Sequence, residues 1–578
     1  MKKLSPFLKP YRKETVLAPF FKLLEAGFDL LVPLIVKQIV DVGVQNGDKP
    51  YIWKMVGVLA AFAVVGLICA LTAQYFAARA AVGFGTSLRS ELFRKIQSFS
   101  YQETDKAGID TLITRMTSDV NQIQSGVNLF LRLLLRSPII VLGAVVLAFT
   151  VDVQGALVFV VVIPLLSAVV FSLLLIGFPL YHRVQKDLDR VTGLTRETLT
   201  GVRVVRAFRN ESREIERFEK ANRAHRNAQK LVGNLSALMN PLTLLLVDGG
   251  LIALLLSGAV RVEAGAMSTG SVIALTNYMA QILIELVKFA NTVFTVNKAL
   301  VCARRVESVL ETPGGMPEHN TEKGETATDA DAMVAFTNVS MTYAGNAAPS
   351  LSGIRFSAKT GEVIGIIGST GSGKSTLVNL IPRFYDVSSG SVRVLGKDVR
   401  DWDTEDLRNQ IAVVPQKAVL FRGTVRSNLL WGNENATDEE LWSALEAAQA
   451  KDFVAEKEGG LDAPVAQNGK NFSGGQRQRL TIARALVRKA KILILDDSAS
   501  ALDYATEAAL RAALRALPEK PTVFIISQRT ASIRHADHIL VLEDGRAVGL
   551  GTHSELLEQC PVYREIYDSQ FKKGGETA

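Results

Sequence analysis

Cysteine and histidine are scarce in this chain, with three Cys and six His among 578 residues. Cys69, Cys302 and Cys560 lie far apart, and their spacing matches neither a disulfide framework nor a metal-binding motif. The N-terminal Lys2-Lys3 is not followed by an apolar run, so we expect a short amphipathic segment at a membrane surface rather than a secretory signal. These absences argue against a small disulfide-stabilised secreted protein and against a cysteine-ligated metal site.

Long apolar segments dominate the first half of the chain. Hydrophobic residues make up 48% of the sequence, and several runs are long enough to cross a hydrocarbon layer of about 30 Å. We therefore predict a helical membrane domain over residues 1–310 with six spans. The predicted spans are residues 15–40, 52–80, 129–150, 155–180, 238–260 and 271–296.

Positive charge is distributed unevenly between the predicted connections. The net charge is +8, and Lys and Arg concentrate at the N-terminus and in the long segments 79–126 and 181–233, while the other connections hold only Lys49 and Arg261. The positive-inside rule places the N-terminus and both long segments in the cytoplasm, so we expect a multi-pass plasma-membrane protein with both termini cytoplasmic. This topology accounts for the basic charge, and we expect no nucleic-acid partner. The long segments 79–126 and 181–233 are predicted to be helical extensions of the spans, with breaks at 98–110 and 200–201.

Ionisable residues inside a membrane are costly and mark candidate sites. They have two interpretations, structural pairing with one another or the lining of a transport path, and the sequence leaves both open. The candidates are Glu25, Asp29, Arg132, Arg136, Asp248, Glu285 and Lys288.

The second half has a different pattern. Residues 311–332 are rich in Pro, Gly and polar residues and predict a linker. From 333 to 573, short β-branched runs alternate with helical stretches, which predicts an α/β domain with a largely parallel sheet. The expected strands cover residues 362–367, 411–414, 492–495, 523–526 and 538–542.

A phosphate-binding loop follows the first of these strands. The pattern G-x-x-x-x-G-K-[ST] between a strand and a helix cradles nucleotide phosphates with backbone N–H groups. We expect Lys374 to reach the β- and γ-phosphates and Ser375 to bind Mg²⁺, so ATP and Mg²⁺ are the predicted cofactors. The loop comprises Gly368, Ser369, Thr370, Gly371, Ser372, Gly373, Lys374, Ser375 and Thr376.

Two further motifs follow. Asp496 ends the apolar run 492–495, where a carboxylate at the end of a parallel strand would lie beside the ligand and hold Mg²⁺. The segment Ser473, Gly474, Gly475, Gln476 begins a helix and is a second candidate anion site. One nucleotide does not need two such sites, so the second is expected to serve the nucleotide of another chain.

With these motifs, residues 334–570 resemble the nucleotide-binding domain of an ABC transporter, and the whole chain resembles a half-size ABC exporter of the multidrug type (type IV). The resemblance implies an aromatic contact of Tyr343 with adenine, a Mg²⁺-sensing role for Gln416, and a place for Asp503 in the interface loop 500–503. It also implies that segments 102–108 and 197–208 couple the two domains.

Two residues depart from the family pattern. The family would carry Glu, the general base, where this chain has Asp497, and a switch histidine where it has Gln528; Gln467-Asn468-Gly469 also lacks the usual acidic form. A shorter carboxylate misplaces the base, and Gln cannot titrate. We therefore expect slow hydrolysis at the chain's own site, and an intact signature that completes the site of a second half-exporter chain in a heterodimer.

Other readings remain. The alternatives are a homodimeric exporter with two slow sites, an ATP-gated channel or regulatory membrane protein, and a soluble ABC protein acting on nucleic acid, against which the predicted spans argue. The apolar spans suit a small hydrophobic or amphiphilic cargo, but no residue identifies it.

Overall fold

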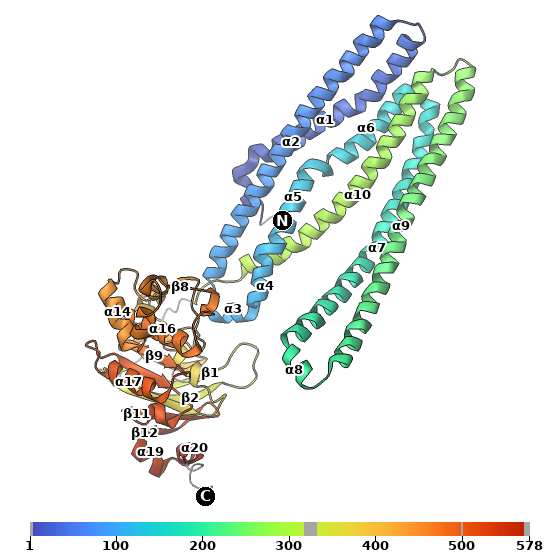
Figure 1. The fold of residues 1–578 in the computed structure, drawn as a ribbon. Helices are drawn as coiled ribbons and strands as arrows, with labels where there is room; N and C mark the ends of the chain where they lie inside the picture. Colours follow the sequence, from blue (N-terminus) through green and yellow to red (C-terminus); the bar gives the residue numbers. More distant parts are fainter. Residues whose placement is uncertain (1–3, 317–331, 499–500, 572–578) are drawn as a thin grey trace. The chain divides into compact units, whose positions relative to one another are not determined.

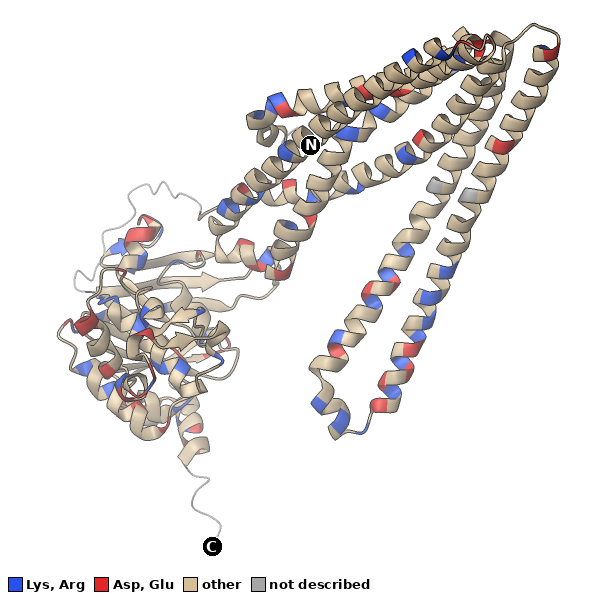
Figure 2. Ribbon diagram, turned by 45° about the horizontal axis from the view of Figure 1, so that its top comes forward, with Lys and Arg blue, Asp and Glu red and all other residues tan. Residues whose placement is uncertain are grey.

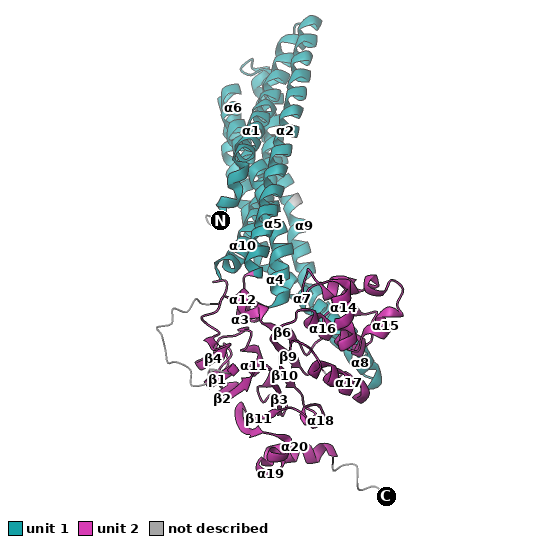
Figure 3. Ribbon diagram, turned by 90° about the vertical axis from the view of Figure 1, so that its left-hand side faces the viewer, with its two compact units in different colours: residues 1–97, 108–312 teal, residues 98–107, 313–578 magenta. Residues whose placement is uncertain are grey.

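The computed structural model describes residues 4–316, 332–498 and 501–571, and it divides into two compact units (Figure 3). The first comprises Met1–Gln97 and Gly108–Thr312, and the second comprises Ser98–Ala107 and Pro313–Ala578. Most of the predicted linker, residues 317–331, lies outside the described residues.

The first unit is built from long helices (Figure 1). Short 3₁₀ or π-helical segments precede or extend several of them, at Ser5–Tyr11, Ile39–Val44, Arg115–Asp119 and Phe130–Leu134. The helices are α1 (Arg12–Gln38), α2 (Lys49–Gln97), α4 (Ile109–Thr114), α5 (Val120–Leu129), α6 (Arg136–Val151), α7 (Val153–Thr200), α8 (Val202–Ala207), α9 (Glu211–Glu263) and α10 (Thr269–Glu311).

Helix ends in this unit follow from local chemistry. The side chain of Asp152 accepts a hydrogen bond from the Gly155 N–H and so starts α7, and Ser268 starts α10 by accepting from the Ser271 N–H. The predicted breaks coincide with helix ends, because α2 stops at Gln97 and α7 stops at Thr200 before Gly201. Charged residues gather toward the α8 end of the α7–α9 hairpin, whereas the opposite ends of these helices are mostly uncharged (Figure 2).

Five of the described helical segments are long and apolar enough to cross a membrane. They are Lys49–Gln97, Ile109–Val151, Val153–Thr200, Glu211–Glu263 and Thr269–Glu311. The predicted first span lies in α1, a 27-residue helix outside this set, which carries Lys22, Glu25 and Asp29. Its role as a sixth span therefore stays a prediction.

The second unit contains an α/β domain with two main sheets. One is antiparallel, in the order β2–β1–β4–β5, and the other has the order β12–β11–β3–β10–β9–β6, with all neighbours parallel except β12 and β11. The largely parallel sheet was predicted. The strands are β1 (Ala332–Met341), β2 (Leu351–Lys359), β3 (Val363–Gly368), β4 (Ser389–Val394), β5 (Lys397–Asp398), β6 (Ile411–Val414), β7 (Gly423–Thr424), β8 (Pro464–Val465), β9 (Ile492–Asp496), β10 (Thr522–Ile526), β11 (His538–Glu543) and β12 (Arg546–Gly551).

Helices cover this sheet and close its core. Residues of β3, β9 and β10 are almost all buried, as expected for strands of a parallel sheet with both faces covered. The described helices of the second unit are α3 (Tyr101–Ala107), α11 (Lys374–Asn379), α12 (Thr404–Asn409), α13 (Val425–Leu429), α14 (Asp438–Ala447), α15 (Lys451–Ala455), α16 (Gly474–Val487), α17 (Tyr504–Arg515), α18 (Thr530–Ile533), α19 (His553–Gln559) and α20 (Pro561–Phe571).

Candidate functional site

Three neighbouring parallel strands bring the predicted site together at their carboxyl ends. β10 lies between β3 and β9, and their registers align Ile526 with both Ile366 and Asp496. The phosphate loop follows β3, Asp497 follows β9, and Gln528 follows β10. The ends of parallel strands are where ligands bind in such sheets, because the loops there diverge and leave a crevice.

A cavity of 590 Å³ lies at this edge. Most predicted site residues line it: Thr370, Gly371, Gly373, Lys374, Ser375, Thr376, Gln416, Asp496, Asp497 and Gln528. The cavity is also lined by residues that were not predicted from the sequence: Asn346, Ser350, Ser527, Asp544 and Gly545. No local pattern marks these residues, because they come from loops that only the fold brings to this edge.

The phosphate loop depends on two glycines with left-handed backbone. Gly371 and Gly373 have φ of 85° and 94°. A Cβ on Gly373 would come within 2.7 Å of Ser350 O and of Leu351, so the loop could not keep its path with a larger residue. The loop therefore turns directly into α11, whose first residue is Lys374.

Lys374 is buried in the loop that it is expected to serve. Its Nζ donates to the carbonyl oxygens of Gly368, at 2.9 Å, and Ser369, at 2.7 Å. Burial lowers the pKa of Lys374, while the nearby Asp497 and Asp496 oppose that shift. An anion that neutralises the ammonium would offset its desolvation, which fits a phosphate oxygen as the ligand.

Asp496 and Ser375 form the candidate metal pair. The Ser375 hydroxyl donates to Asp496 Oδ1 at 3.1 Å. Desolvation raises the pKa of Asp496, the Ser375 hydrogen bond lowers it, and the neighbouring Asp497 raises it further. With Gln416 on the same cavity, the donors are all hard oxygens, which suits Mg²⁺. No cluster of three or more His, Cys, Asp or Glu able to hold a metal occurs among the described residues.

Asp497 is held in an unusual backbone conformation. Its φ is 47°, and its N–H donates to Ile526 O at 3.0 Å. Asp tolerates the left-handed region better than most residues. Desolvation raises the pKa of its carboxyl group, and a hydrogen bond from Gln416 lowers it. The shorter acid therefore faces the cavity beside Gln416, at the position of the predicted base.

Gln528 is exposed, and its backbone is tied to α20. Gln570 Nε2 donates to Gln528 O at 2.8 Å, and Gln570 Oε1 accepts from the Thr530 N–H and hydroxyl, both at 2.9 Å. One amide side chain near the C-terminus thus bridges the segment that carries the switch position. Gln570 was not foreseen, because nothing in the sequence near position 570 suggests a contact with position 528.

Tyr343 lies next to the loop rather than on the cavity wall. Its hydroxyl donates to Thr376 Oγ1 at 3.1 Å, and its ring meets Tyr385 edge-on at 5.1 Å. The ring is half-buried, so its predicted contact with adenine stays a prediction.

The signature segment does not line this cavity. Ser473 begins α16 with a reciprocal capping box, in which its hydroxyl accepts from the Gln476 N–H at 3.3 Å and Gln476 Oε1 accepts from the Ser473 N–H at 3.0 Å. Ser473 and Gly474 are exposed, and open space surrounds Gly474. Asp503 begins α17 by accepting from the Thr506 N–H at 2.8 Å; Ser500 lies outside the described residues. The start of α16 is therefore formed, and its residues are not among those that line the cavity.

The predicted coupling segment 102–108 largely coincides with α3, which belongs to the second unit. The Tyr101 ring stacks on Phe384 at 4.5 Å, and the Tyr385 hydroxyl donates to Asp105 Oδ2 at 2.7 Å. Burial and the Asp105 carboxylate raise the pKa of Tyr385, so the phenol remains a donor. The second predicted segment, 197–208, contains α8 and lies in the first unit.

The predicted intramembrane charges are largely paired within the first unit. Arg136 Nη1 donates to Glu285 Oε1 at 2.6 Å and its Nη2 to Asp29 Oδ2 at 2.8 Å, which joins α6 to α10 and α1. Ser137 and Lys288 also donate to Glu285, and Lys22 pairs with Glu25. Arg132 donates to Asn128 at 3.4 Å, and Asp248 is exposed. Structural pairing thus accounts for most of these residues.

Comparison with known proteins finds a family match for each of the two units. The family described as "ABC transporter transmembrane region" matches residues 15–286, and the family described as "ABC transporter" matches residues 351–500. An uncharacterised ABC transporter ATP-binding protein of Mycobacterium tuberculosis is 39% identical over 98% of this chain and 97% of its own length. An ATP-dependent lipid A-core flippase of Yersinia pestis is 30% identical over 99% and 97%. Among solved structures, a bacterial Atm1-family ABC exporter with ATP bound matches with a TM-score of 0.80 and 23% identity, over 98% of this chain and 99% of that one.

Proposed function

The chain belongs to the ABC transporter family as a half-size exporter that uses ATP to drive transport across a membrane. We propose that it works as the weakly hydrolytic half of a heterodimer. In this proposal its own site binds Mg²⁺ and ATP but turns over slowly. Its signature completes the hydrolytic site of a partner chain that supplies Glu and His at the two altered positions.

One observation carries the proposal. The cavity that gathers the phosphate loop, Asp496 and the altered Asp497 and Gln528 excludes the signature helix of the same chain, although the start of that helix is correctly capped. A signature outside its own cavity supports a role in completing the site of a second chain, and an intact signature beside an altered base supports unequal sites.

The residues divide the work at the chain's own site. Gly371 and Gly373 shape the loop, Lys374 neutralises phosphate charge, and Ser375 with Asp496 would hold Mg²⁺, which supplies charge neutralisation at the phosphates when bound. Asp497 would orient water, but its carboxylate is one methylene shorter than that of Glu, and a displacement of about 1 Å can cost on the order of 100-fold in rate. Gln528 can donate a hydrogen bond but cannot be protonated to a positively charged form.

Coupling to transport would follow from differential binding. ATP bound between the nucleotide-binding domains of the two chains stabilises their closed arrangement. Only in that arrangement does the nucleotide contact both a phosphate loop and a signature. The α3 contacts of Tyr101 and Asp105 with Phe384 and Tyr385 would pass this closure toward the membrane helices. We place the protein in the plasma membrane with both termini in the cytoplasm.

For the cargo we propose a hydrophobic or amphiphilic small molecule. A cavity of 540 Å³ between α1 and α2 is lined by apolar and aromatic side chains, including Phe28 and Phe62. Glu25 and Asp29 also line it, and their carboxylates are already paired with Lys22 and Arg136. The name of the similar Yersinia protein, a lipid A-core flippase, refers to a lipid. Both features fit a cargo with an apolar body and a polar group.

The decisive experiment measures ATP hydrolysis by the chain alone and by the pair formed with its partner half-exporter, both in nanodiscs. In the pair, Ser473→Ala should lower hydrolysis by about 100-fold, the cost of removing one charge-stabilising donor, whereas Asp497→Asn should change it little. Thr437→Ala, which removes the equivalent capping box from α14, controls for loss of helix stability. Brisk hydrolysis and transport by the chain alone would instead establish the homodimer and overturn the proposal.

A further inference from the structure

A second cavity lies at the opposite edge of the parallel sheet from the nucleotide cavity. It measures 440 Å³ and is lined by Gly361 and Val363 at the beginning of β3, by α17, and by residues 532–537 in and after α18. The phosphate loop follows the end of β3, and the two cavities share no lining residue. The second cavity is therefore separate from the site described above.

Cations outnumber carboxylates around this cavity. Arg511, Arg515 and Lys520 line it, and Asp537 is the one acidic residue among the described lining residues. The Asp537 carboxylate already accepts the Val363 N–H at 2.8 Å. Arg515 and Lys520 have no carboxylate within ion-pair distance among residues 4–316, 332–498 and 501–571. Arg515 Nη2 donates to the His535 carbonyl oxygen, which leaves its positive charge without a compensating anion.

Ser532 presents a buried hydroxyl in the same wall. The residue is 2% exposed, lines the cavity, and its Oγ has no hydrogen-bond partner among the described residues. A buried polar group without a partner is destabilising, because it has given up its hydrogen bonds to water. A ligand oxygen that accepts from this hydroxyl would remove that cost.

The remaining wall is apolar. It includes Ala508 and Ala512 on α17, Pro521, and Val523 and Ile525 on β10. An inorganic ion would leave this surface in contact with water, whereas a ligand with an apolar body would cover it. The geometry points to a binding site for a small amphiphilic anion, with its carboxylate between Arg515, Lys520 and the Ser532 hydroxyl and its apolar body against α17 and β10.

The place of this site in the fold suggests what the ligand would do. Ser532 lies four residues after Gln528, and Arg511 Nη1 donates to Ala531 O at 2.9 Å and to Glu507 Oε1 at 3.2 Å, which ties α18 to α17. An anion here would add a contact to α18 beyond those of Gln570 and so restrict the segment that carries Gln528. This regulatory consequence rests on the proposed function, whereas the binding itself does not.

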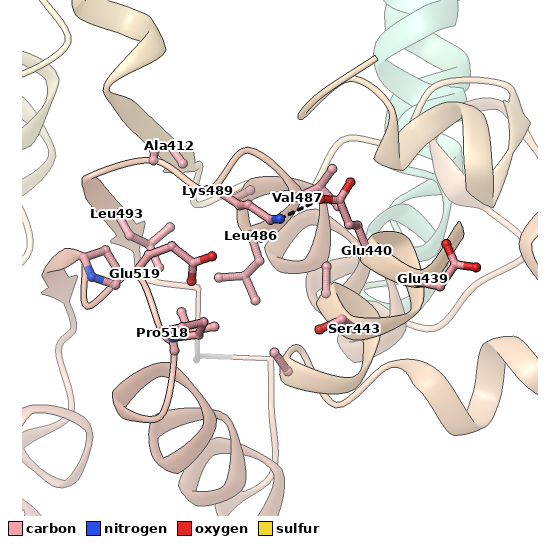
Figure 4. Close-up of a pocket in the computed structure, with 16 residues that line it drawn as sticks. Ala412, Glu439, Glu440, Ser443, Leu486, Val487, Lys489, Leu493, Pro518 and Glu519 are labelled. Carbon is pink, nitrogen blue, oxygen red and sulfur yellow. Dashed lines mark hydrogen bonds and ion pairs between the residues drawn. The ribbon is translucent and has the colours of Figure 1, made fainter. Parts of the chain in front are cut away.

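A neighbouring cavity provides a matched control. It measures 310 Å³ and lies beside the end of α16, where Lys489 is already paired with Glu440 at 2.6 Å (Figure 4). Glu439 and Glu519 also line it, so its acidic residues outnumber its one lysine. The same anion should not bind there.

The test is titration calorimetry of the nucleotide-free full chain in nanodiscs with phenylhexanoate, after subtraction of empty nanodiscs. We expect saturable binding of phenylhexanoate and none of phenylhexanol or phenylhexylamine at the same concentrations. Ser532→Ala should weaken binding about tenfold without lowering thermal stability, because no existing hydrogen bond is lost. The Arg515→Gln and Lys520→Gln double variant should weaken it further, and Lys489→Gln should leave it unchanged.

A second measurement locates the bound phenylhexanoate in the chain. Hydrogen–deuterium exchange should show protection by phenylhexanoate in α17 and in residues 530–537. Equal binding of the neutral alcohol, or binding unaffected by both the Ser532 variant and the double variant, would overturn the proposal. Binding that is present without any change in ATP hydrolysis would retain the site and remove its regulatory role.

Discussion

Asp497 donates its backbone N–H to the carbonyl oxygen of Ile526 at 3.0 Å, so the acidic residue after β9 is fixed to the strand that leads to Gln528. The two altered positions of the site are therefore neighbours in space as well as departures from one family pattern. A substitution at one of them is expected to shift the backbone at the end of β10 and so the position of the other. The two residues are therefore best tested together.

Restoring both positions should activate the chain's own site. In the pair with its partner half-exporter, whose own site is inactivated at its phosphate-loop lysine, Asp497→Glu with Gln528→His should raise ATP hydrolysis at least about tenfold, because a longer carboxylate reaches the water and His can carry charge. Phosphate release measures this. Adding Lys374→Ala should abolish the gain, and an unchanged rate in the double variant would show that these residues do not limit hydrolysis.

The amide of Gln570 should hold the switch segment. Gln570→Ala removes the bond to Gln528 O and both bonds from Thr530, so hydrogen exchange in residues 527–533 should quicken by up to about 100-fold, as expected for losing three hydrogen bonds worth about 1 kcal/mol each. Gln570→Glu is the matched control, since it retains the acceptor for Thr530 and loses only the donor to Gln528. Identical exchange in wild type and both variants would contradict the assignment.

The Arg136–Glu285 pair should matter for the stability of the helical unit. Their side chains are 10% and 5% exposed, and removal of one partner from a buried pair costs about 3–5 kcal/mol. Arg136→Met should therefore lower the thermal unfolding temperature in nanodiscs, and adding Glu285→Gln should recover part of the loss. Arg132→Met, which removes only a 3.4 Å bond to Asn128, should have little effect.

Asp496 should destabilise the nucleotide-free protein at neutral pH. Desolvation raises the pKa of its carboxyl group above the unfolded value, so the folded state binds the extra proton. The cost of its burial is absent below the unfolded pKa of about 3.9 and is complete above the raised folded value. Asp496→Asn should therefore raise the unfolding temperature at pH 7 by roughly 2–4 °C and by less as the pH falls toward 4. Differential scanning calorimetry without nucleotide measures this, and an equal gain at both pH values would argue against the titration.

The same variant provides a second readout with Mg²⁺ and ATP. Wild type should be stabilised by the nucleotide because ligand binding favours the folded state, whereas Asp496→Asn should lose much of that stabilisation if Asp496 helps hold Mg²⁺. A nucleotide-dependent shift of equal size in both proteins would remove Asp496 from the metal site.

Local sequence was sufficient where chemistry is local. The phosphate loop is recognisable because its glycines permit backbone that other residues cannot adopt, as the φ of Gly373 confirms. The strands before Lys374 and Asp496 were predictable because buried parallel strands need continuous apolar runs. The breaks predicted at 98–110 and 200–201 coincide with the ends of α2 at Gln97 and of α7 at Thr200.

Residues that act across the fold were not predictable. Gln570, Asp544 and Ser532, whose hydroxyl lacks a partner among the described residues, carry no local signature, because each derives its role from a neighbour 30 or more positions away or from a cavity wall. The intramembrane charges show the same limit. Their presence pointed to a special role, but the choice between pairing and a transport path depended on where Arg136 lies relative to Asp29 and Glu285.

The sequence by itself determined an ATP-binding α/β domain joined to apolar helices, and it identified Asp497 and Gln528 as departures. These features depend on spacing along the chain, which is how a strand, a tight loop and a helix start are specified. Only the tertiary structure decided that the signature lies outside the chain's own cavity, that Arg136 pairs with carboxylates on two other helices, and that a basic cavity lies behind α18. Each of these depends on distances between segments remote in sequence, and packing sets those distances.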